Sequence, residues 1–108
     1  KIFVITSGEN MAIHAAANIA MAVENFKDRG YAQLGGLILN RRNVKNEDAK
    51  VEELAEDIHS KVIGTLSRSA LVTDAEEQKK TVIEAYPDSE MAEEYRILAG
   101  KIRTLCGI

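Results

Sequence analysis

Three short runs of aliphatic and β-branched residues mark the expected strands of this chain, at residues 1–5, 34–39 and 61–66. None of the runs alternates cleanly between apolar and polar positions, which is typical of strands covered on both faces. Stretches with a helical spacing of apolar residues separate and follow them, at positions 51, 54, 55 and 58, over residues 70–79, and at positions 91, 95, 98, 102 and 105. Strands alternating with helices predict a parallel α/β sheet with right-handed crossovers.

Local signals predict where these helices begin and end. Thr6 and Glu9 have the spacing of a capping box in front of the first helix, and Gly30 is expected to close that helix. Asn46 is the expected cap of the second helix. Pro87-Asp88 is expected to open the last helix.

The first helix is apolar over most of its surface. From Met11 to Val23 only His14 and Asn18 are polar, and together with Asn10 they form an i, i+4, i+8 stripe. A helix that is apolar on nearly every face is covered on nearly every face, and a sheet covers only one side of it. The polar stripe contacts either solvent and polar groups of the same domain, or another subunit or domain.

Charge and composition narrow the classes of partner. The net charge is -3, and the basic runs are as short as Arg41-Arg42 and Lys79-Lys80, which argues against a nucleic-acid groove or an anionic membrane surface. No apolar run approaches the ~20 residues that a membrane span needs. The single cysteine cannot form an internal disulfide, so a reducing, cytoplasmic compartment is expected.

No motif in the chain performs a reaction by itself. The G-x-x-x-x-G-K-[ST] loop, the G-x-G-x-x-G loop, the G-x-S-x-G elbow and paired metal-ligand spacings do not occur. His14 and His59 lie far apart in sequence, and we expect neither to be catalytic or to bind a metal. Cys106 is the single thiol, and one thiol per chain cannot hold an iron–sulfur cluster.

Polar residues follow each expected strand, at residues 7–11, 40–42 and 67–69. In open α/β sheets, ligands bind beyond the carboxyl ends of the strands. Asn40 directly follows a buried strand, and its amide presents a donor and an acceptor together, which matches an adenine edge. Asparagine is also a common turn residue, so this position alone indicates either a nucleotide contact or a turn.

Four blocks of sequence resemble the C-terminal part of the nitrogenase iron protein family: Thr6-Ser-Gly-Glu9, Gly35-Gly-Leu-Ile38 with Asn40, Thr81-Val-Ile-Glu84, and Pro87-Asp-Ser89 followed by Glu94-Tyr-Arg96. Their order and intervals match as well, and the resemblance covers essentially the whole chain. The same pattern runs through the ATP-dependent reductase subunits of dark-operative protochlorophyllide reductase and of nickel-tetrapyrrole biosynthesis.

The resemblance implies a three-layer αβα parallel sheet that forms the C-terminal part of a P-loop NTPase fold. The chain begins at Lys1, without an initiator methionine, and enters a strand at once, so it is expected to be a piece of a longer protein. The family's Walker loop, switch segments and cluster cysteines precede the matching segment. Residues 1–108 are therefore expected to be a C-terminal fragment of one domain whose Walker A half is absent.

The resemblance also implies a function for the parent protein. Members of the family are cytoplasmic homodimers that bind one MgATP per subunit and one 4Fe-4S cluster between the subunits. ATP hydrolysis gates electron transfer to a larger catalytic complex, of the nitrogenase or the tetrapyrrole-reductase type. Neither nucleic acid nor a membrane is an expected partner, and the fragment alone is expected to be inactive.

Site residues follow from the resemblance position by position. Asn40 matches the asparagine that contacts adenine. The remaining positions match the loop beside the base and ribose (Ser67, Arg68 and Ser69), further residues of the nucleotide pocket (Glu76 and Tyr95), and residues that reach across the dimer interface (Glu9 and Met11). No catalytic residue and no metal ligand is expected in this chain.

The sequence departs from the family pattern at several of these positions. Ser67 and Ser69 replace a proline and an aspartate, Thr73 and Met91 replace glutamines, and His14 and Asn10 replace an aromatic residue and a methionine. These changes loosen the loop beside the base and remove hydrogen bonds to the nucleotide, and they leave both nitrogenase proper and a nitrogenase-like reductase open. The alternatives are a cluster-free P-loop ATPase of the partitioning or septum-positioning type, and a free-standing binding module.

Overall fold

The computed structural model describes residues 1–26 and 33–107. Strands and helices follow one another in the order β1 (Ile2–Thr6), α1 (Asn10–Phe26), β2 (Leu34–Asn40), α2 (Glu47–Asp57), β3 (Val62–Leu66), α3 (Ala70–Glu77), α4 (Val82–Ala85) and α5 (Glu90–Cys106). Every strand boundary lies within one residue of the expected one. The short helix α4 was not predicted, and Gly30, the expected end of the first helix, lies outside the described residues.

The three strands form one parallel sheet in the order β1-β2-β3. The central strand carries two glycines where it meets its neighbours most closely. A Cβ on Gly35 would lie 2.6 Å from Cε1 of Phe3 on β1. A Cβ on Gly36, whose φ is +149°, would lie 2.6 Å from Cγ2 of Ile63 on β3. A larger residue would therefore have to displace the side chain of Phe3 or Ile63, and at Gly36 the positive φ also favours glycine.

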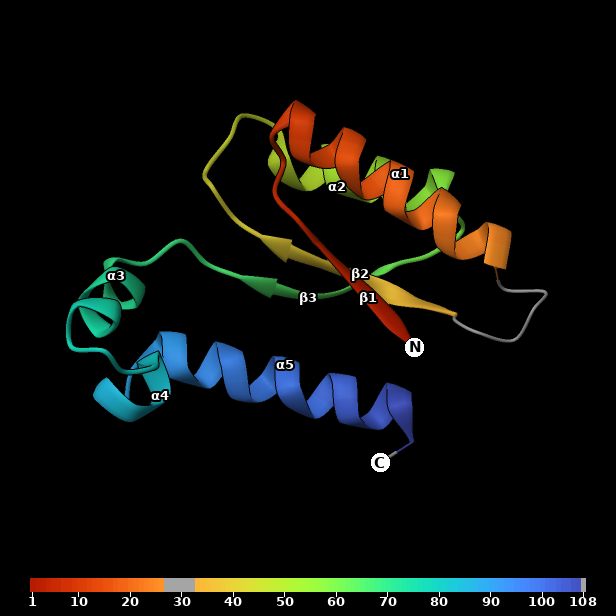
Figure 1. The fold of residues 1–108 in the computed structure, drawn as a ribbon. Coiled ribbons are helices and arrows are strands. Elements are labelled where there is room, and N and C mark those ends of the chain that lie inside the picture. Colours follow the sequence, from red (N-terminus) through yellow and green to blue (C-terminus); the bar gives the residue numbers. More distant parts are fainter. Residues whose placement is uncertain (27–32, 108) are drawn as a thin grey trace.

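Helices cover both faces of the sheet, as Figure 1 shows, with α1 and α2 on one side and α3, α4 and α5 on the other. Because side chains alternate along β2, Leu37 and Leu39 pack under α1 and α2 while Ile38 packs toward α5. These three side chains are at most 3% exposed. The expected three-layer αβα sheet is confirmed, and its strand ends are held by a core on each side.

The helix caps differ from the sequence prediction. The expected capping box of Thr6 and Glu9 does not form, because α1 begins only at Asn10 and Thr6 is the last residue of β1, where its hydroxyl donates to the carbonyl of Ser7. Asn46 does precede α2, but in a left-handed conformation (φ 58°) and without a side-chain cap. Ser89, rather than Pro87-Asp88, caps α5 through the amide of Ala92.

A capping box does form elsewhere, at the start of α4. The hydroxyl of Thr81 accepts from the amide of Glu84 and the carboxylate of Glu84 accepts from the amide of Thr81. This pair of bonds is the reason that a helix as short as α4 forms here, because it satisfies two of the amides that a helix start leaves unpaired.

Helix α1 is covered on its inner side only. Ala16, Ala20 and Val23 are buried against the sheet, whereas Met11 is 87% exposed and Met21 62%. The polar stripe begins beside α2, where Asn10 accepts a hydrogen bond from Lys50 (3.3 Å). No helix in the described part of the chain is long and apolar enough to cross a membrane.

Candidate functional site

Three loops gather where the strands end: residues 7–9 after β1, residues 41–46 after β2 and residues 67–69 after β3. We call this surface the carboxyl edge. The loops follow parallel strands of one sheet, so they leave it on the same side (Figure 1). The second loop is bonded directly to the end of β3, because the amide of Arg41 donates to the carbonyl of Leu66 (2.9 Å).

Glu47, the first residue of α2, is the buried acid at the centre of the carboxyl edge. Only 5% of this residue is exposed. Its carboxylate accepts hydrogen bonds from the amides of Gly8 (2.8 Å), Arg42 (3.1 Å) and Asn43 (3.2 Å). Burial by itself raises the pKa of Glu47, but these three bonds and the nearby charge of Arg41 together bring the pKa below its ordinary value of 4.5.

Gly8 permits this arrangement because it has no side chain. A Cβ at Gly8 would lie 2.5 Å from Cγ and 2.8 Å from Cα of Glu47. The backbone of the β1–α1 turn therefore lies directly against the start of α2. The expected cap at Asn46 implies that Glu47 begins a helix, but no local pattern indicates its burial, which depends on Gly8 in another loop.

Charged side chains connect the loops further. Arg42 lies 3.5 Å from the carboxylate of Glu9, which also accepts from the hydroxyl of Ser7 (3.2 Å). Arg68 donates to the carbonyl of Arg42 (3.3 Å). The carboxylate of Glu94, on α5, accepts from the amide of Ser67 (2.8 Å). All three loops are thus held together by hydrogen bonds and one ion pair.

The predicted site residues fall into separate groups in this structure. Asn40 is the last residue of β2, where it is exposed beside Leu66 of β3. Glu9 and residues 67–69 lie on the same edge, and the hydroxyl of Ser69 caps α3 by accepting from the amide of Leu71 (3.2 Å). Met11 points away into solvent from the first turn of α1.

Glu76 and Tyr95 lie apart from Asn40. They line a mostly apolar hollow of about 560 Å³ between α3, α4 and α5, together with Val72 and Ile83. Met91, which stands where the family has glutamine, is buried in the core beneath α5 and is 4% exposed. The structure therefore brings Glu9, Asn40 and residues 67–69 to one edge but does not bring Glu76 and Tyr95 into the same hollow as Asn40.

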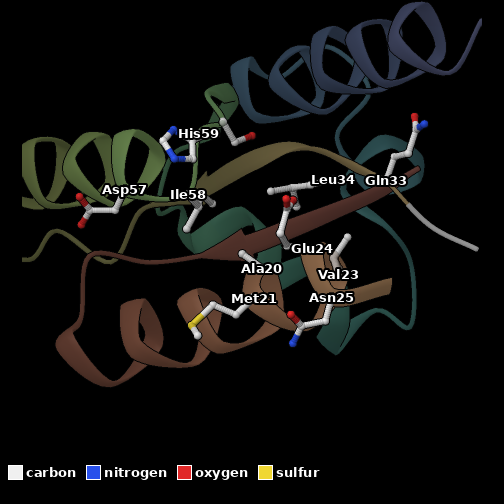
Figure 2. A pocket seen from close by; sticks show the side chains of 11 residues that line it. Ala20, Met21, Val23, Glu24, Asn25, Gln33, Leu34, Asp57, Ile58 and His59 are labelled. Carbon is white, nitrogen blue, oxygen red and sulfur yellow. The ribbon is translucent and has the colours of Figure 1, made fainter. Parts of the chain in front are cut away.

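A larger pocket opens at the other end of the sheet, between the last turns of α1 and α2 and the start of β2. Figure 2 shows Met21 and Asn25 of α1 on one side of it and Asp57 and His59 on the other. Its volume is about 980 Å³. It contains none of the site residues predicted from the sequence.

The residues described here do not fit an iron–sulfur cluster. Cys106 is the single cysteine of the chain, and it is exposed in the last turn of α5. No group of three or more His, Cys, Asp or Glu side chains in the described ranges is arranged to hold a metal ion. A cluster coordinated by four thiolates would need cysteines that this chain does not contain.

Comparison with solved structures supports the fold. The cell division ATPase MinD of Pyrococcus furiosus superimposes with a TM-score of 0.73 at 13% sequence identity, over 95% of this chain and 43% of that chain. The chain thus has the αβα fold of a P-loop NTPase and spans less than half the length of this similar structure. A protein-family model described as 4Fe-4S iron sulfur cluster binding proteins, NifH/frxC family, matches residues 1–105. With this match over nearly its full length, the chain belongs to the NifH/frxC family of iron–sulfur proteins.

Proposed function

We propose that this chain is the C-terminal part of an ATP-dependent iron–sulfur reductase. In the full-length gene product, MgATP hydrolysis drives electron transfer from a 4Fe-4S cluster to a larger catalytic complex of the nitrogenase or tetrapyrrole-reductase type. This segment contributes the base side of the nucleotide pocket and part of the face between two identical subunits. The Walker loop and the cluster cysteines come from the rest of the protein, in the cytoplasm. Family membership supports this proposal.

Exposed apolar side chains support the proposal that the domain is larger than this chain. Ile5, on the edge strand β1, is 63% exposed, and Met11 at the start of α1 is more exposed still. Apolar side chains that are grouped on an edge strand and a neighbouring helix are usually covered by protein. We propose that the missing part of the domain covers β1. The partner subunit covers the surface around Glu9 and Met11.

The position of Asn40 is the observation that carries the nucleotide assignment. The three residues before it are buried in the central strand, so its backbone is fixed while its side chain is exposed at the carboxyl edge. An amide can accept from the exocyclic amine of adenine and donate to a ring nitrogen. Arg42 and Arg68 surround the same edge, and the loop before α3 stays beside it through the bond from Ser67 to Glu94.

In the proposed pocket, Glu76 and Tyr95 lie beyond the loop of residues 67–69, in a hollow of their own rather than beside Asn40. Tyr95 is adjacent in α5 to Glu94, which accepts the amide of Ser67, so the base-side loop and Tyr95 are attached to the same turn of one helix. Met91 is buried in the core, so its side chain offers no polar contact to a nucleotide.

Replacing Asn40 with leucine in the full-length gene product tests the assignment. A neutral hydrogen bond contributes about 0.5–1.5 kcal/mol, so Asn40→Leu is expected to weaken ATP binding roughly 3–10-fold and to reduce the preference for ATP over GTP. Asn18→Leu, at an exposed position on α1, is the matched control and should change neither affinity. Titration of both nucleotides against each variant is the measurement, and an unchanged ATP-to-GTP ratio in folded Asn40→Leu would refute the role of Asn40.

Cysteines upstream of Lys1 distinguish the reductase from the cluster-free ATPase. Similarity to MinD at 13% identity establishes the fold alone, so it does not favour a cell-division ATPase over a reductase. Two cluster cysteines upstream of Lys1 in the gene would support the reductase, and their absence would support the alternative.

A further inference from the structure

The carboxylate of Glu47 is a buried charge that is stabilised mainly by hydrogen bonds from backbone amides, with a smaller contribution from the charge of Arg41. The two nearest arginines pair with other acids, Arg41 with Asp48 (3.0 Å) and Arg42 with Glu9 (3.5 Å). Burying an ionised carboxylate is unfavourable unless several donors replace its water. Here the amides of Gly8, Arg42 and Asn43 are those donors, and bonds of this charge-assisted kind are about twice as strong as neutral ones.

The three donors come from two different loops. Gly8 belongs to the turn that carries Glu9, whereas Arg42 and Asn43 belong to the loop that directly follows Asn40. The carbonyl of Arg42 in turn accepts from Arg68, in the loop before α3. A movement of the Asn40 loop would therefore change the geometry of the Glu9 turn through the side chain of Glu47, in addition to the ion pair between Arg42 and Glu9.

We propose that Glu47 is a positioning residue that couples the nucleotide loop after Asn40 to the subunit-facing turn that carries Glu9. This inference rests on the proposed function, because the roles of Asn40 and Glu9 belong to it. Glu47 itself is buried, so its proposed role is exerted through the two loops. The Glu47 carboxylate sets the distance between the two loops. It thereby fixes the position of Asn40, which binds the base, relative to Glu9, which contacts the second subunit.

Three variants of the full-length gene product separate positioning from general stability. Glu47→Gln keeps the shape of the side chain but replaces one acceptor oxygen with an NH₂ that faces amide donors. Glu47→Asp keeps the charge but is one methylene shorter, so it reaches fewer of the three amides. Glu52→Gln, at an exposed position on the same helix, removes the same charge from the surface and is the control.

Amide hydrogen exchange at single-residue resolution measures the coupling between the two loops directly. In Glu47→Gln we expect the amides of both loops to exchange about tenfold faster or more, while the amide of Leu37, in the middle of β2 and bonded to the carbonyl of Lys61, keeps its wild-type rate. Glu47→Asp should lie between Glu47→Gln and wild type. General loss of stability would accelerate Leu37 as well, and that outcome, or unchanged rates in both loops, would overturn the inference.

Titration with MgATP completes the test. We expect Glu47→Gln to raise the dissociation constant several-fold, about as far as the loss of one or two neutral hydrogen bonds. Fast exchange in both loops with wild-type ATP affinity would overturn the positioning role. A wild-type protein that binds no ATP would refute the proposed function instead, and the exchange rates would still decide whether Glu47 connects the two loops.

Discussion

At the scale of single residues, Glu47 makes the stability of the folded protein depend on pH. Its three amide donors and the neighbouring arginine keep its pKa below 4.5 in the folded protein, although burial acts in the opposite direction. In the unfolded chain these donors are lost and the pKa returns to its ordinary value. Between the two pKa values the unfolded state therefore binds more protons than the folded state, so acid favours unfolding.

The free energy of unfolding is expected to fall as the pH drops below about 4.5, and part of this fall should be absent in Glu47→Gln. Urea unfolding at a series of pH values from about 3 to 7 measures it. Glu84 also has a lowered pKa, because the amide and hydroxyl of Thr81 donate to it, so the wild type and the variant must be compared at each pH. Parallel curves for the two proteins would contradict the role assigned to the Glu47 carboxylate.

At the scale of elements, the carboxyl edge depends on how closely α2 approaches the turn between β1 and α1. The approach leaves no room for a side chain at Gly8, since a Cβ there would overlap the backbone of Glu47. Gly100 has different surroundings. Gly100, on the exposed side of α5, has no atom within 4 Å of the place where a Cβ would be.

Gly8→Ala and Gly100→Ala are therefore expected to have opposite effects. Gly8→Ala should destabilise the protein by about 1–3 kcal/mol, because α2 must move away from the turn and Glu47 then loses the amide of Gly8. Gly100→Ala should stabilise it by about 0.5–1 kcal/mol, because alanine loses less backbone entropy in a helix. Chemical denaturation measures both, and a Gly8→Ala protein of wild-type stability would mean that the approach is looser than described.

At this scale the strands were predictable from the sequence, whereas several helix caps were not. The strands were predicted to within one residue because β2 is buried on both faces and its apolar run is unbroken. The caps were mispredicted where tertiary structure overrides local preference: β1 extends through Thr6, which is buried, and α1 begins only at Asn10, so Thr6 is not at the N-cap position. Asn46 adopts a left-handed conformation that leaves its side chain without a cap bond.

The candidate site was also predictable only in part. That polar residues after the strands meet at one edge follows from parallel topology, and Asn40 and residues 67–69 lie there as expected. Glu47 was missed because its burial depends on Gly8, 39 residues away. The separate hollow of Glu76 and Tyr95 depends on how α3 and α4 fold back on α5, which no local spacing encodes.

At the scale of the whole molecule, the family of this chain and its cysteine content have to be explained together. The family is one of 4Fe-4S proteins, yet the chain has one cysteine, exposed in the last turn of α5. The chain also spans 43% of a similar solved ATPase. Both observations are explained if the cluster ligands lie in a part of the protein that these residues do not include.

Iron analysis of anaerobically purified protein tests this account most directly. The full-length gene product should contain about four iron atoms per dimer, the content of one 4Fe-4S cluster, with the visible absorption of such a cluster. Residues 1–108 alone, reconstituted under the same conditions, should bind no stoichiometric iron. A full-length protein that binds ATP but contains no iron would contradict the account, and so would stoichiometric iron bound to residues 1–108 through Cys106.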